Sequence, residues 1–343
     1  LHSDDPSNEG ARPYPFYLAY PLDDPAAVAD PALWFAERKW DGIRGQLVLR
    51  GGAHHLWSRG EDLVTDRFPE LARALDWLPQ GTVLDGEITA WDAPAARPLP
   101  FAALQTRIGR KTLTKAVLDR APVLLIAYDL LEQDGQDIRA LPFADRRARL
   151  EALLRGLPPD APLRLSPEVP FRTLDDLASA RAASREHAAE GLMLKRRASP
   201  YGTGRRKGDW WKWKVDPFSV DAVMVYAQAG SGRRANLFTD FTFAVRDGEA
   251  LVPFCKAYSG LTDEEFARIT AWVHRHTTQR FGPVRQVEPV QVFEIGFEGI
   301  QSSPRHKSGV ALRFPRMLRW RTDKPPEEID TLDTLRALLA AQR

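Results

Sequence analysis

Residues 39–44 (KWDGIR) place a lysine, a carboxylate, a glycine and an arginine within one short turn. A lysine ammonium, with an ordinary pKa of about 10.4, becomes a nucleophile only after it loses its proton. Nearby cations and partial burial favour the neutral amine, and Arg44 is close in sequence to Lys39. Lysine suits this role because its pKa moves, whereas arginine stays charged. On its own the segment is more simply explained as a solvated hairpin, so Lys39 needs support from other residues.

Four further clusters follow Lys39 in a fixed order and supply that support. They are residues 58–60 (SRG), 85–88 (DGEI), 190–195 (EGLMLK) and 211–214 (WKWK). With residues 39–44 they resemble the nucleotidyltransferase motifs of ATP-dependent DNA ligases, and the match extends from about residue 16 to residue 343. The resemblance implies that Lys39 attacks the α-phosphorus of ATP, giving a lysyl-adenylate and pyrophosphate. It also implies a divalent metal, Mg²⁺ or in its place Mn²⁺.

The resemblance gives the carboxylates separate roles. It assigns Glu37 to the adenine edge and Asp41 to the surroundings of the nucleophile. It assigns Glu87 to the ribose hydroxyl and, with Glu190, to the metal site. Mg²⁺ prefers one or two carboxylates together with phosphate oxygens and water, so two acids suffice. Taken singly, Glu87 is as well explained as an exposed acid at a strand edge, and Glu190 as an acid at a helix end.

Cationic and aromatic residues complete the nucleotide site that the resemblance implies. Tyr128 is expected to stack on adenine, with ordinary core packing as its alternative. Lys212 and Lys214 alternate with tryptophans on a predicted strand, so their ammoniums share a face and can reach one phosphate. The resemblance assigns the triphosphate to these two lysines and assigns phosphate or nick contacts to Arg44 and Arg59.

Two basic blocks stand out on a chain whose net charge is only +2. Residues 195–214 hold eight Lys or Arg and one acid, and residues 313–324 hold five and one. Such blocks indicate a local surface for a polyanion, although a solvated arginine-rich surface gives the same pattern. In the first block, a predicted loop with Arg205, Arg206 and Lys207 is expected to contact the DNA backbone; a mobile solvated loop is the alternative.

The second basic block resembles the last ligase motif. There the resemblance places Arg313 at the leaving pyrophosphate, and Asp323 is the nearest candidate for the motif's acidic position.

The hydrophobic pattern predicts an α+β chain of two domains, which 343 residues can supply. Residues 1–15 are polar and rich in Pro and Gly, and are expected to be a poorly ordered linker or cut edge. Residues 16–216 are expected to form an adenylation (nucleotidyltransferase) domain of antiparallel sheets with flanking helices. Residues 217–343, after the Asp216-Pro217 break, are expected to form a small β barrel with a C-terminal helix. The name OB-fold for this barrel rests on the resemblance.

Local signals place the elements within these domains. Capping boxes at Thr173 with Asp176 and at Thr262 with Glu265 predict helices at 173–186 and 262–281, beside further helices at 142–154 and 327–341. The apolar run 121–131 predicts a strand buried on both faces. Other strands are predicted at 33–38, 43–50, 54–58, 82–90, 191–196, 210–215, 218–227, 236–245, 250–258, 289–298 and 310–314.

Cys255 is the single cysteine, which excludes an internal disulfide and a cysteine-based zinc site. It fits a reducing compartment such as the bacterial cytoplasm. No apolar run approaches the roughly 20 residues needed to span a membrane. Because the chain does not begin with methionine, we expect that it is cut from a longer protein whose upstream part is an N-terminal DNA-binding domain. The expected partner is nicked double-stranded DNA, bound by a monomer.

Three other functions share some of these features. An RNA ligase or a capping-type guanylyltransferase uses the same lysine motif, and the preference for ATP or GTP would separate the latter. An OB-type nucleic-acid-binding module with an inert partner domain suits the basic blocks and the ten tryptophans, but does not need Lys39, Glu87, Glu190 and Lys212 together. An NAD-dependent ligase is disfavoured, because a single cysteine cannot supply the zinc module of that class.

Overall fold

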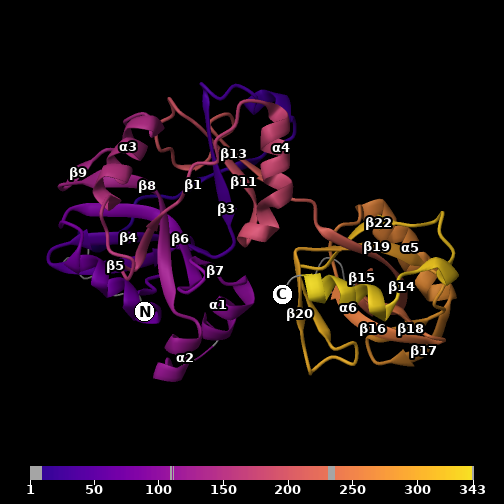
Figure 1. Cartoon of the computed structure of the whole chain (residues 1–343). Coiled ribbons are helices and arrows are strands. Elements are labelled where there is room, and N and C mark those ends of the chain that lie inside the picture. Colours follow the sequence, from indigo (N-terminus) through magenta and orange to yellow (C-terminus); the bar gives the residue numbers. More distant parts are fainter. Residues whose placement is uncertain (1–9, 109, 111, 231–235, 342–343) are drawn as a thin grey trace. The chain divides into compact units, whose positions relative to one another are not determined.

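The computed structural model describes residues 10–108, 110, 112–230 and 236–341. The chain divides into two compact units, Leu1–Val215 and Asp216–Arg343 (Figure 1). Both units combine mainly antiparallel sheets with short helices, so the predicted α+β class is confirmed. In the first unit, β10 with β8 and β13 with β2 pair in parallel. Within the described residues, none of the helices has the length and hydropathy that a membrane crossing requires.

The larger sheet of the first unit has the strand order β10-β8-β6-β4-β5, with β7 and β9 at its margins. Its two central strands, β6 (Thr82–Asp92) and β8 (Val123–Gln133), are buried along almost their whole length. Helices and the second sheet cover both faces of these strands, so the predicted strand in the apolar run 121–131 is confirmed. The flanking strands are β4 (Ile43–Arg50), β5 (Ala53–Ser58), β7 (Arg97–Pro98), β9 (Gln136–Asp137) and β10 (Leu163–Leu165).

The smaller sheet of the first unit carries three of the motif clusters, in the order β2-β13-β11-β3. Its strands are β2 (Tyr20–Pro21), β3 (Trp34–Trp40), β11 (Ala189–Arg196) and β13 (Trp210–Lys214). A short parallel pair, β1 (Tyr17–Leu18) with β12 (Gly204–Arg205), forms a separate two-stranded sheet that packs against both larger ones.

Strand β11 contains a bulge beside Lys39. Ala189 pairs with Trp40 and Leu192 pairs with Arg38, so two residues of β11 lie opposite the single residue between them on β3. One of the two is Gly191, whose φ of +146° is strained for any other residue. A Cβ there would also lie 2.2 Å from the carbonyl oxygen of Trp213. The bulge therefore needs glycine at this position.

The described residues of the first unit also include the α-helices α1 to α4 and the 3-10 helices η2 to η5. The predicted capping box is confirmed, since Thr173 and Asp176 exchange both of its hydrogen bonds at the start of α4. Helix α3 is anchored to β8 by a wholly buried ion pair, Arg146 Nε to Asp129 Oδ1 at 2.8 Å. The bounds are α1 (Phe101–Ile108), α2 (Lys115–Arg120), α3 (Phe143–Leu154), α4 (Leu174–Ala182), η2 (Pro25–Val28), η3 (Thr65–Arg67), η4 (Pro69–Asp76) and η5 (Ala183–His187).

Residues 10–15 correct one prediction. They were expected to be poorly ordered, but Tyr14 N donates to Gln46 Oε1 at 2.8 Å and the Tyr14 hydroxyl donates to Glu132 Oε2 at 2.6 Å. Burial and the Glu132 carboxylate raise the pKa of Tyr14 to about 12. Composition missed this because one aromatic residue with two polar partners is enough to anchor a polar segment. Residues 1–9 lie outside the described residues.

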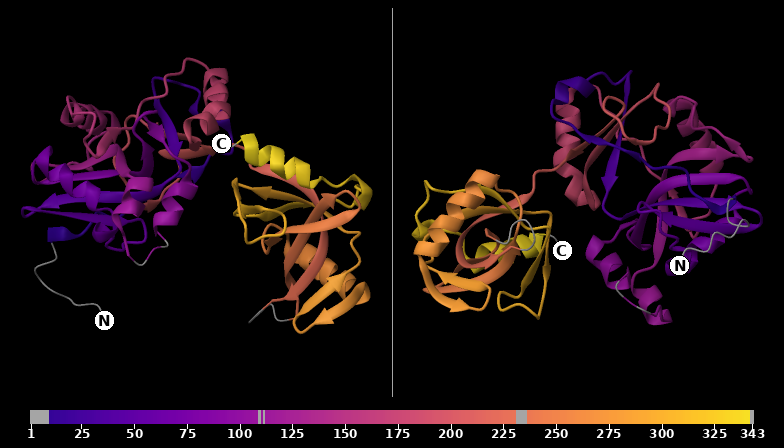
Figure 2. Two further views of the ribbon diagram at one scale, coloured as in Figure 1. Left: turned by 60° about the horizontal axis from the view of Figure 1, so that its bottom comes forward. Right: turned by 180° about the vertical axis from the view of Figure 1, so that it is seen from behind.

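The second unit is a small barrel whose strands curve around a large apolar core, with a smaller apolar cluster beside it (Figure 2). The twelve-residue strand β14 (Phe218–Ala229) pairs with β15 along one edge and with both β18 and β19 along the other. One long strand thus serves two halves of the barrel. The other strands are β15 (Phe238–Asp247), β16 (Ala250–Ala257), β17 (Thr277–Phe281), β18 (Val284–Val287), β19 (Val292–Phe297), β20 (Gly299–Ser302), β21 (Val310–Arg313) and β22 (Arg316–Trp320).

Both predicted helices of this unit form, with different ends. The Thr262–Glu265 capping box is confirmed and opens α5 (Asp263–Arg275), but the helix does not continue to residue 281. Residues 277–281 instead form β17, which pairs with β18. The C-terminal helix α6 (Leu332–Ala341) begins five residues later than predicted, after a 3-10 turn, η7 (Pro326–Glu328). Pairing of β17 with β18 ends the first helix early. The prolines at the 3-10 turn delay the start of the second.

Cys255 lies on β16 against this core, and burial raises the pKa of its thiol. Because the thiolate is the reactive form, we expect Cys255 to react with a maleimide at pH 7.5 at least roughly tenfold more slowly in the folded protein than in 6 M guanidinium chloride. Intact mass of samples in which labelling is quenched at successive times measures the two rates. Equal rates in the two conditions would contradict it.

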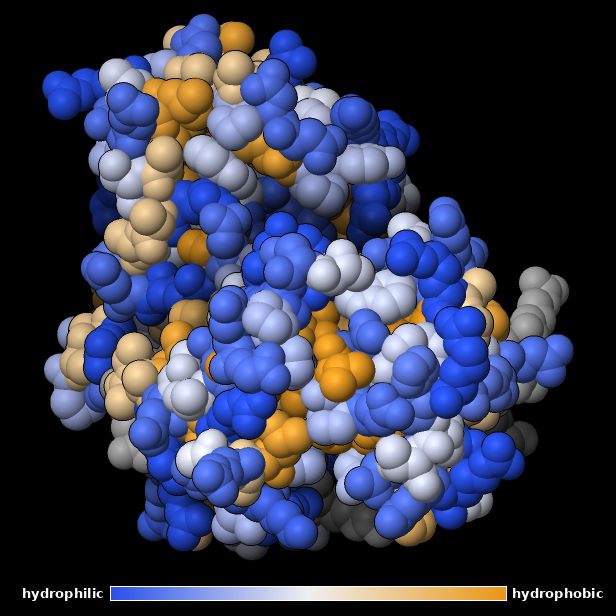
Figure 3. Space-filling model, turned by 90° about the vertical axis from the view of Figure 1, so that its right-hand side faces the viewer, coloured by the Kyte–Doolittle hydropathy of each residue, from blue (hydrophilic) through white to orange (hydrophobic). Residues whose placement is uncertain are grey.

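The face of the molecule in Figure 3 is largely hydrophilic, with apolar side chains scattered between charged ones.

Candidate active site

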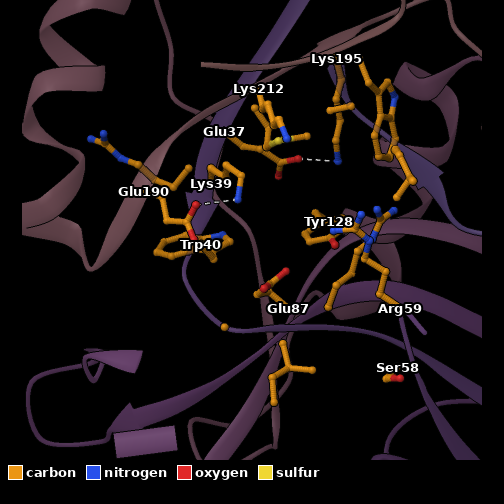
Figure 4. Close-up of a pocket in the computed structure, with 18 of the residues that line it drawn as sticks. Glu37, Lys39, Trp40, Ser58, Arg59, Glu87, Tyr128, Glu190, Lys195 and Lys212 are labelled. Carbon is orange, nitrogen blue, oxygen red and sulfur yellow. Dashed lines mark hydrogen bonds and ion pairs between the residues drawn. The ribbon is translucent and has the colours of Figure 1, made fainter. Parts of the chain in front are cut away.

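A pocket of about 440 Å³ opens between the two sheets of the first unit (Figure 4). Strands β3, β11 and β13 form one wall, and β4, β6 and β8 form the other. The predicted residues that line it are Glu37, Lys39, Arg44, Arg59, Glu87, Tyr128, Glu190, Arg205 and Lys212. The fold therefore brings residues separated by up to 175 positions, from Glu37 to Lys212, to one cavity.

Lys39 and Lys214 meet on one carboxylate, Glu190. Lys39 Nζ lies 3.0 Å and Lys214 Nζ 3.2 Å from Glu190 Oε2. Burial by itself would raise the pKa of Glu190, but the two ammoniums lower it to about 2. Glu190 is therefore ionised and holds the Lys39 amine in a fixed place at the pocket wall.

The bulge in β11 explains how Glu190 comes to face the pocket. Side chains alternate along a regular strand, so Glu190 would point away from Met193 and Lys195. The extra residue at Gly191 reverses that alternation, and all three side chains line the pocket.

Glu37 lies at the inner end of the pocket, two residues before Lys39 and on the same face of β3. Its carboxylate is 1% exposed, and its Oε1 lies 2.6 Å from Lys195 Nζ. Lys195 Nζ also lies over the ring of Tyr128, 4.4 Å from its centroid. The residue predicted for the adenine edge and the residue predicted to stack on adenine thus share a neighbour, Lys195, to which sequence analysis gave no role.

Glu87 lies on the opposite wall, in β6. Part of its surface faces the pocket, but the surrounding protein raises its pKa to about 8, and Lys39 and Arg44 offset only part of that effect. Glu190 contributes to the shift as well, which places the two carboxylates within electrostatic reach of each other. Two carboxylates beside a space for phosphates fit the donor set that Mg²⁺ takes.

Arg44 is held more tightly than predicted. Its Nε and Nη2 donate to the two oxygens of buried Asp85, at 3.1 and 2.7 Å, and Nη1 donates to the Tyr17 carbonyl at 2.6 Å. With the 3.3 Å contact to the Tyr201 hydroxyl, four of its five N–H groups have partners. Arg44 lines the pocket, and among the described residues its fifth N–H has no hydrogen-bond partner.

Positive charge gathers at the open side of the pocket. Burial lowers the pKa of Lys212, and Lys39, Arg205, Lys214 and Arg59 lower it further. Such mutual repulsion is relieved by an anion, so this side of the pocket suits a phosphate chain.

The remaining predicted residues of the first unit lie outside the pocket lining. Lys214 reaches Glu190, as described above, but does not line the pocket as Lys212 does. Asp41 is half-buried in the bend between β3 and β4, next to Gly42. Arg206 and Lys207 are exposed in the loop after β12, and of the three loop cations only Arg205 lines the pocket.

The predicted residues of the last motif lie in the second unit. Arg313 is half-buried on β21, and Asp323 accepts hydrogen bonds from Arg321 at 3.0 and 2.9 Å. Asp221, a half-buried acid on β14, was not predicted. It accepts from Arg321 Nη1 at 3.1 Å and from Lys324 Nζ at 2.7 Å. No sequence signal marked Asp221, because its partners are about 100 residues away.

Comparison with protein families gives these features a context. The model of the ATP dependent DNA ligase domain matches residues 18–214, more than half of the chain. The chain belongs to the ATP-dependent DNA ligase family. The model of the ATP dependent DNA ligase C terminal region matches residues 234–324, within the second unit, which has the OB-fold of this family.

Individual relatives agree with this membership. A probable DNA ligase of Opitutus terrae is 42% identical over 94% of this chain and 34% of its own length. One of Koribacter versatilis is 38% identical over 96% of this chain and 61% of its own length. The solved structure of mycobacterial DNA ligase D complexed with ATP and MES is 26% identical and covers 92% of this chain and 98% of its own, with a TM-score of 0.50. The chain thus spans between a third and two thirds of the length of these two curated relatives.

Proposed function

We propose that this chain is the catalytic core of a DNA ligase that uses ATP to seal nicks in duplex DNA through a covalent AMP on Lys39. The observation that carries the proposal is the place of the Lys39 amine. It lies at the junction between the buried Glu37–Tyr128 end of the pocket, which suits a purine base, and the cationic end with Lys212, which suits phosphates.

In the first step Lys39 Nζ attacks the α-phosphorus of ATP. A phosphoramidate bond forms, the bond from the α-phosphorus to the bridging oxygen breaks, pyrophosphate leaves and the amine proton passes to solvent. Glu190 orients the amine, while Lys212 and Arg59 neutralise the charge on the phosphates. Glu87 and Glu190 would hold Mg²⁺ or Mn²⁺, which supplies charge neutralisation at the phosphates.

In the second and third steps the AMP moves to DNA and is released. The 5′-phosphate at the nick displaces Lys39 from the phosphorus, and the 3′-hydroxyl then attacks that 5′-phosphate with AMP as the leaving group. Each step exchanges one bond to phosphorus for another, so no further reactant is needed. Splitting the reaction lets ATP activate an otherwise unreactive phosphate.

Intact mass after incubation with ATP and Mg²⁺, followed by a chase with nicked duplex DNA, tests the proposal. We expect one added AMP that disappears as the nick is sealed. No adduct on folded protein freed of bound AMP would overturn the lysyl-adenylate. An adduct that forms with GTP and not with ATP would favour a capping enzyme, and one that transfers only to nicked RNA would favour an RNA ligase.

We further propose that the chain acts as a monomer. We also propose that regions outside it add DNA-binding surface, because the chain spans only part of its relatives' length. Sedimentation with and without nicked DNA checks the first point. Dimers at assay concentration would contradict it. Multiple-turnover sealing as fast as that of a full-length relative would contradict the second.

The exposed cations Arg206 and Lys207 are proposed to contact the DNA backbone, with Arg205 at the pocket rim. Replacing Arg206 and Lys207 with glutamine should weaken binding to nicked DNA and lower the slope of log affinity against log salt by about one per lost phosphate contact. Self-adenylation should not change, because neither residue lines the pocket.

The matched control is the exchange of two other exposed cations, Arg149 and Arg155, for glutamine. If both double variants weaken DNA binding equally, the loop acts only through net charge and the contact is contradicted.

A further inference from the structure

Three charged side chains meet behind the inner end of the pocket: Glu37 of β3, Lys195 of β11 and Arg147 of α3. Glu37 Oε1 lies 2.6 Å from Lys195 Nζ, and Glu37 Oε2 lies 3.8 Å from Arg147 Nη1. All three side chains are at most 6% exposed. Removing ions from water is costly, so such a cluster needs good geometry or a further partner.

The cluster is incomplete by itself. Among the described residues, both Glu37 oxygens, Lys195 Nζ and Arg147 Nη1 lack a hydrogen bond, although Glu37 Oε1 and Lys195 Nζ form an ion pair at 2.6 Å. Buried polar atoms nearly always have partners. Glu37 and Lys195 face the pocket (Figure 4), so a bound molecule can supply the missing ones. A carboxylate beside an ammonium matches the adenine edge, which offers an amino donor next to a ring-nitrogen acceptor.

Arg147 differs from its two neighbours because it does not line the pocket. Three contacts fix it: Nε to Glu151 Oε1 at 2.7 Å, Nη2 to the Ser166 carbonyl at 2.6 Å, and its guanidinium over the Phe35 ring at 4.9 Å. These contacts leave Nη1 turned toward Glu37 Oε2. Arg147 is thus placed to act on a bound base only through Glu37.

We propose that Arg147 is a positioning residue for base selection: it holds Glu37 so that the carboxylate accepts from the purine 6-amino group and rejects a 6-keto group. The inference rests on the proposed function, since it takes the pocket to be the nucleotide site. Without Arg147, the carboxylate has Lys195 as its only close cation in the cluster and can turn to pair with it completely. The carboxylate is then less available to the base.

The test compares self-adenylation rates with ATP and with ITP, which carries a keto group in place of the amine. Arg147→Met should raise the KM for ATP by about tenfold, the scale of a hydrogen bond to a charged group, with little change in kcat. The ratio of kcat/KM for ATP to that for ITP should fall by about the same factor. Arg149→Met, an exposed arginine on the same helix, is the matched control and should change neither.

A double-mutant cycle separates positioning from a purely structural role. Glu37→Gln should lower the ATP-to-ITP ratio, and adding Arg147→Met to it should lower the ratio no further. Should Arg147→Met fail to fold, Arg147→Lys takes its place. An ATP-to-ITP ratio closer to that of the wild type than to that of Glu37→Gln would then support the proposal.

Two outcomes would overturn the inference. One is an unchanged ratio in Arg147→Met despite a lower melting temperature, and the other is additive losses in the cycle. Failure of the wild-type chain to form any AMP adduct would instead overturn the proposed function, so the two failures are distinguishable.

Discussion

Lys39→Arg is expected to abolish the AMP adduct completely while ATP still binds. Arginine keeps a positive charge within reach of Glu190, which lies 3.0 Å from the lysine amine, but a guanidinium does not deprotonate to give a nucleophile. The variant therefore separates loss of the nucleophile from loss of charge. Intact mass after incubation with ATP and Mg²⁺ measures the adduct, and equilibrium binding of a labelled ATP analogue measures the affinity.

Lys115→Arg is the matched control, because Lys115 is exposed on α2 outside the pocket. It should form the adduct at the wild-type rate. Persistent adduct on Lys39→Arg, mapped by peptide mass to another residue, would show that the pocket adenylates a different nucleophile.

Glu190→Gln is expected to slow self-adenylation on the order of a hundredfold or more, the cost of removing a preorganised electrostatic partner. Glutamine preserves the size of the side chain and can still accept a hydrogen bond from Lys39. It removes the negative charge that Lys39 and Lys214 share at 3.0 and 3.2 Å, and it leaves those two ammoniums to repel each other. Single-turnover rates at saturating ATP measure the effect.

Glu186→Gln, an exposed acid on η5 four residues earlier, controls for the loss of one negative charge. It should adenylate normally. A rate for Glu190→Gln within about threefold of wild type would mean that Glu190 neither orients Lys39 nor contributes to the metal site.

Much of the site could be predicted from the sequence, because the spacing of two residues along a strand decides whether their side chains share a face. Glu37 and Lys39 are two residues apart and share a face of β3, and Lys212 lines the pocket as its alternation with tryptophan suggested. Single-sequence patterns also found β8 and both capping boxes, whose signals lie within a few residues of each other.

Contacts between distant segments could not be found in this way. Arg44 lines the pocket, but its hydrogen bonds to Asp85, 41 residues later, were not predicted, because they form only once β4 pairs with β6. Arg147 showed only helical periodicity, and its approach to Glu37 exists only because α3 packs behind β3. The end of α5 was missed for the same reason, since β17 forms only where β18 is available as its partner.

The bulge at Gly191 has a consequence for how this strand can change over evolution. Substitutions along β11 alter one side chain at a time, but loss of a single codon before Met193 would restore regular alternation. Glu190 would then turn away from the pocket that Met193 and Lys195 still face. We therefore expect codon-deletion libraries to tolerate gaps in the exposed turn at residues 93–96 and to reject them in β11, even where every remaining residue is unchanged. In this strand the number of residues, and not only their identity, therefore decides which side chains face the pocket.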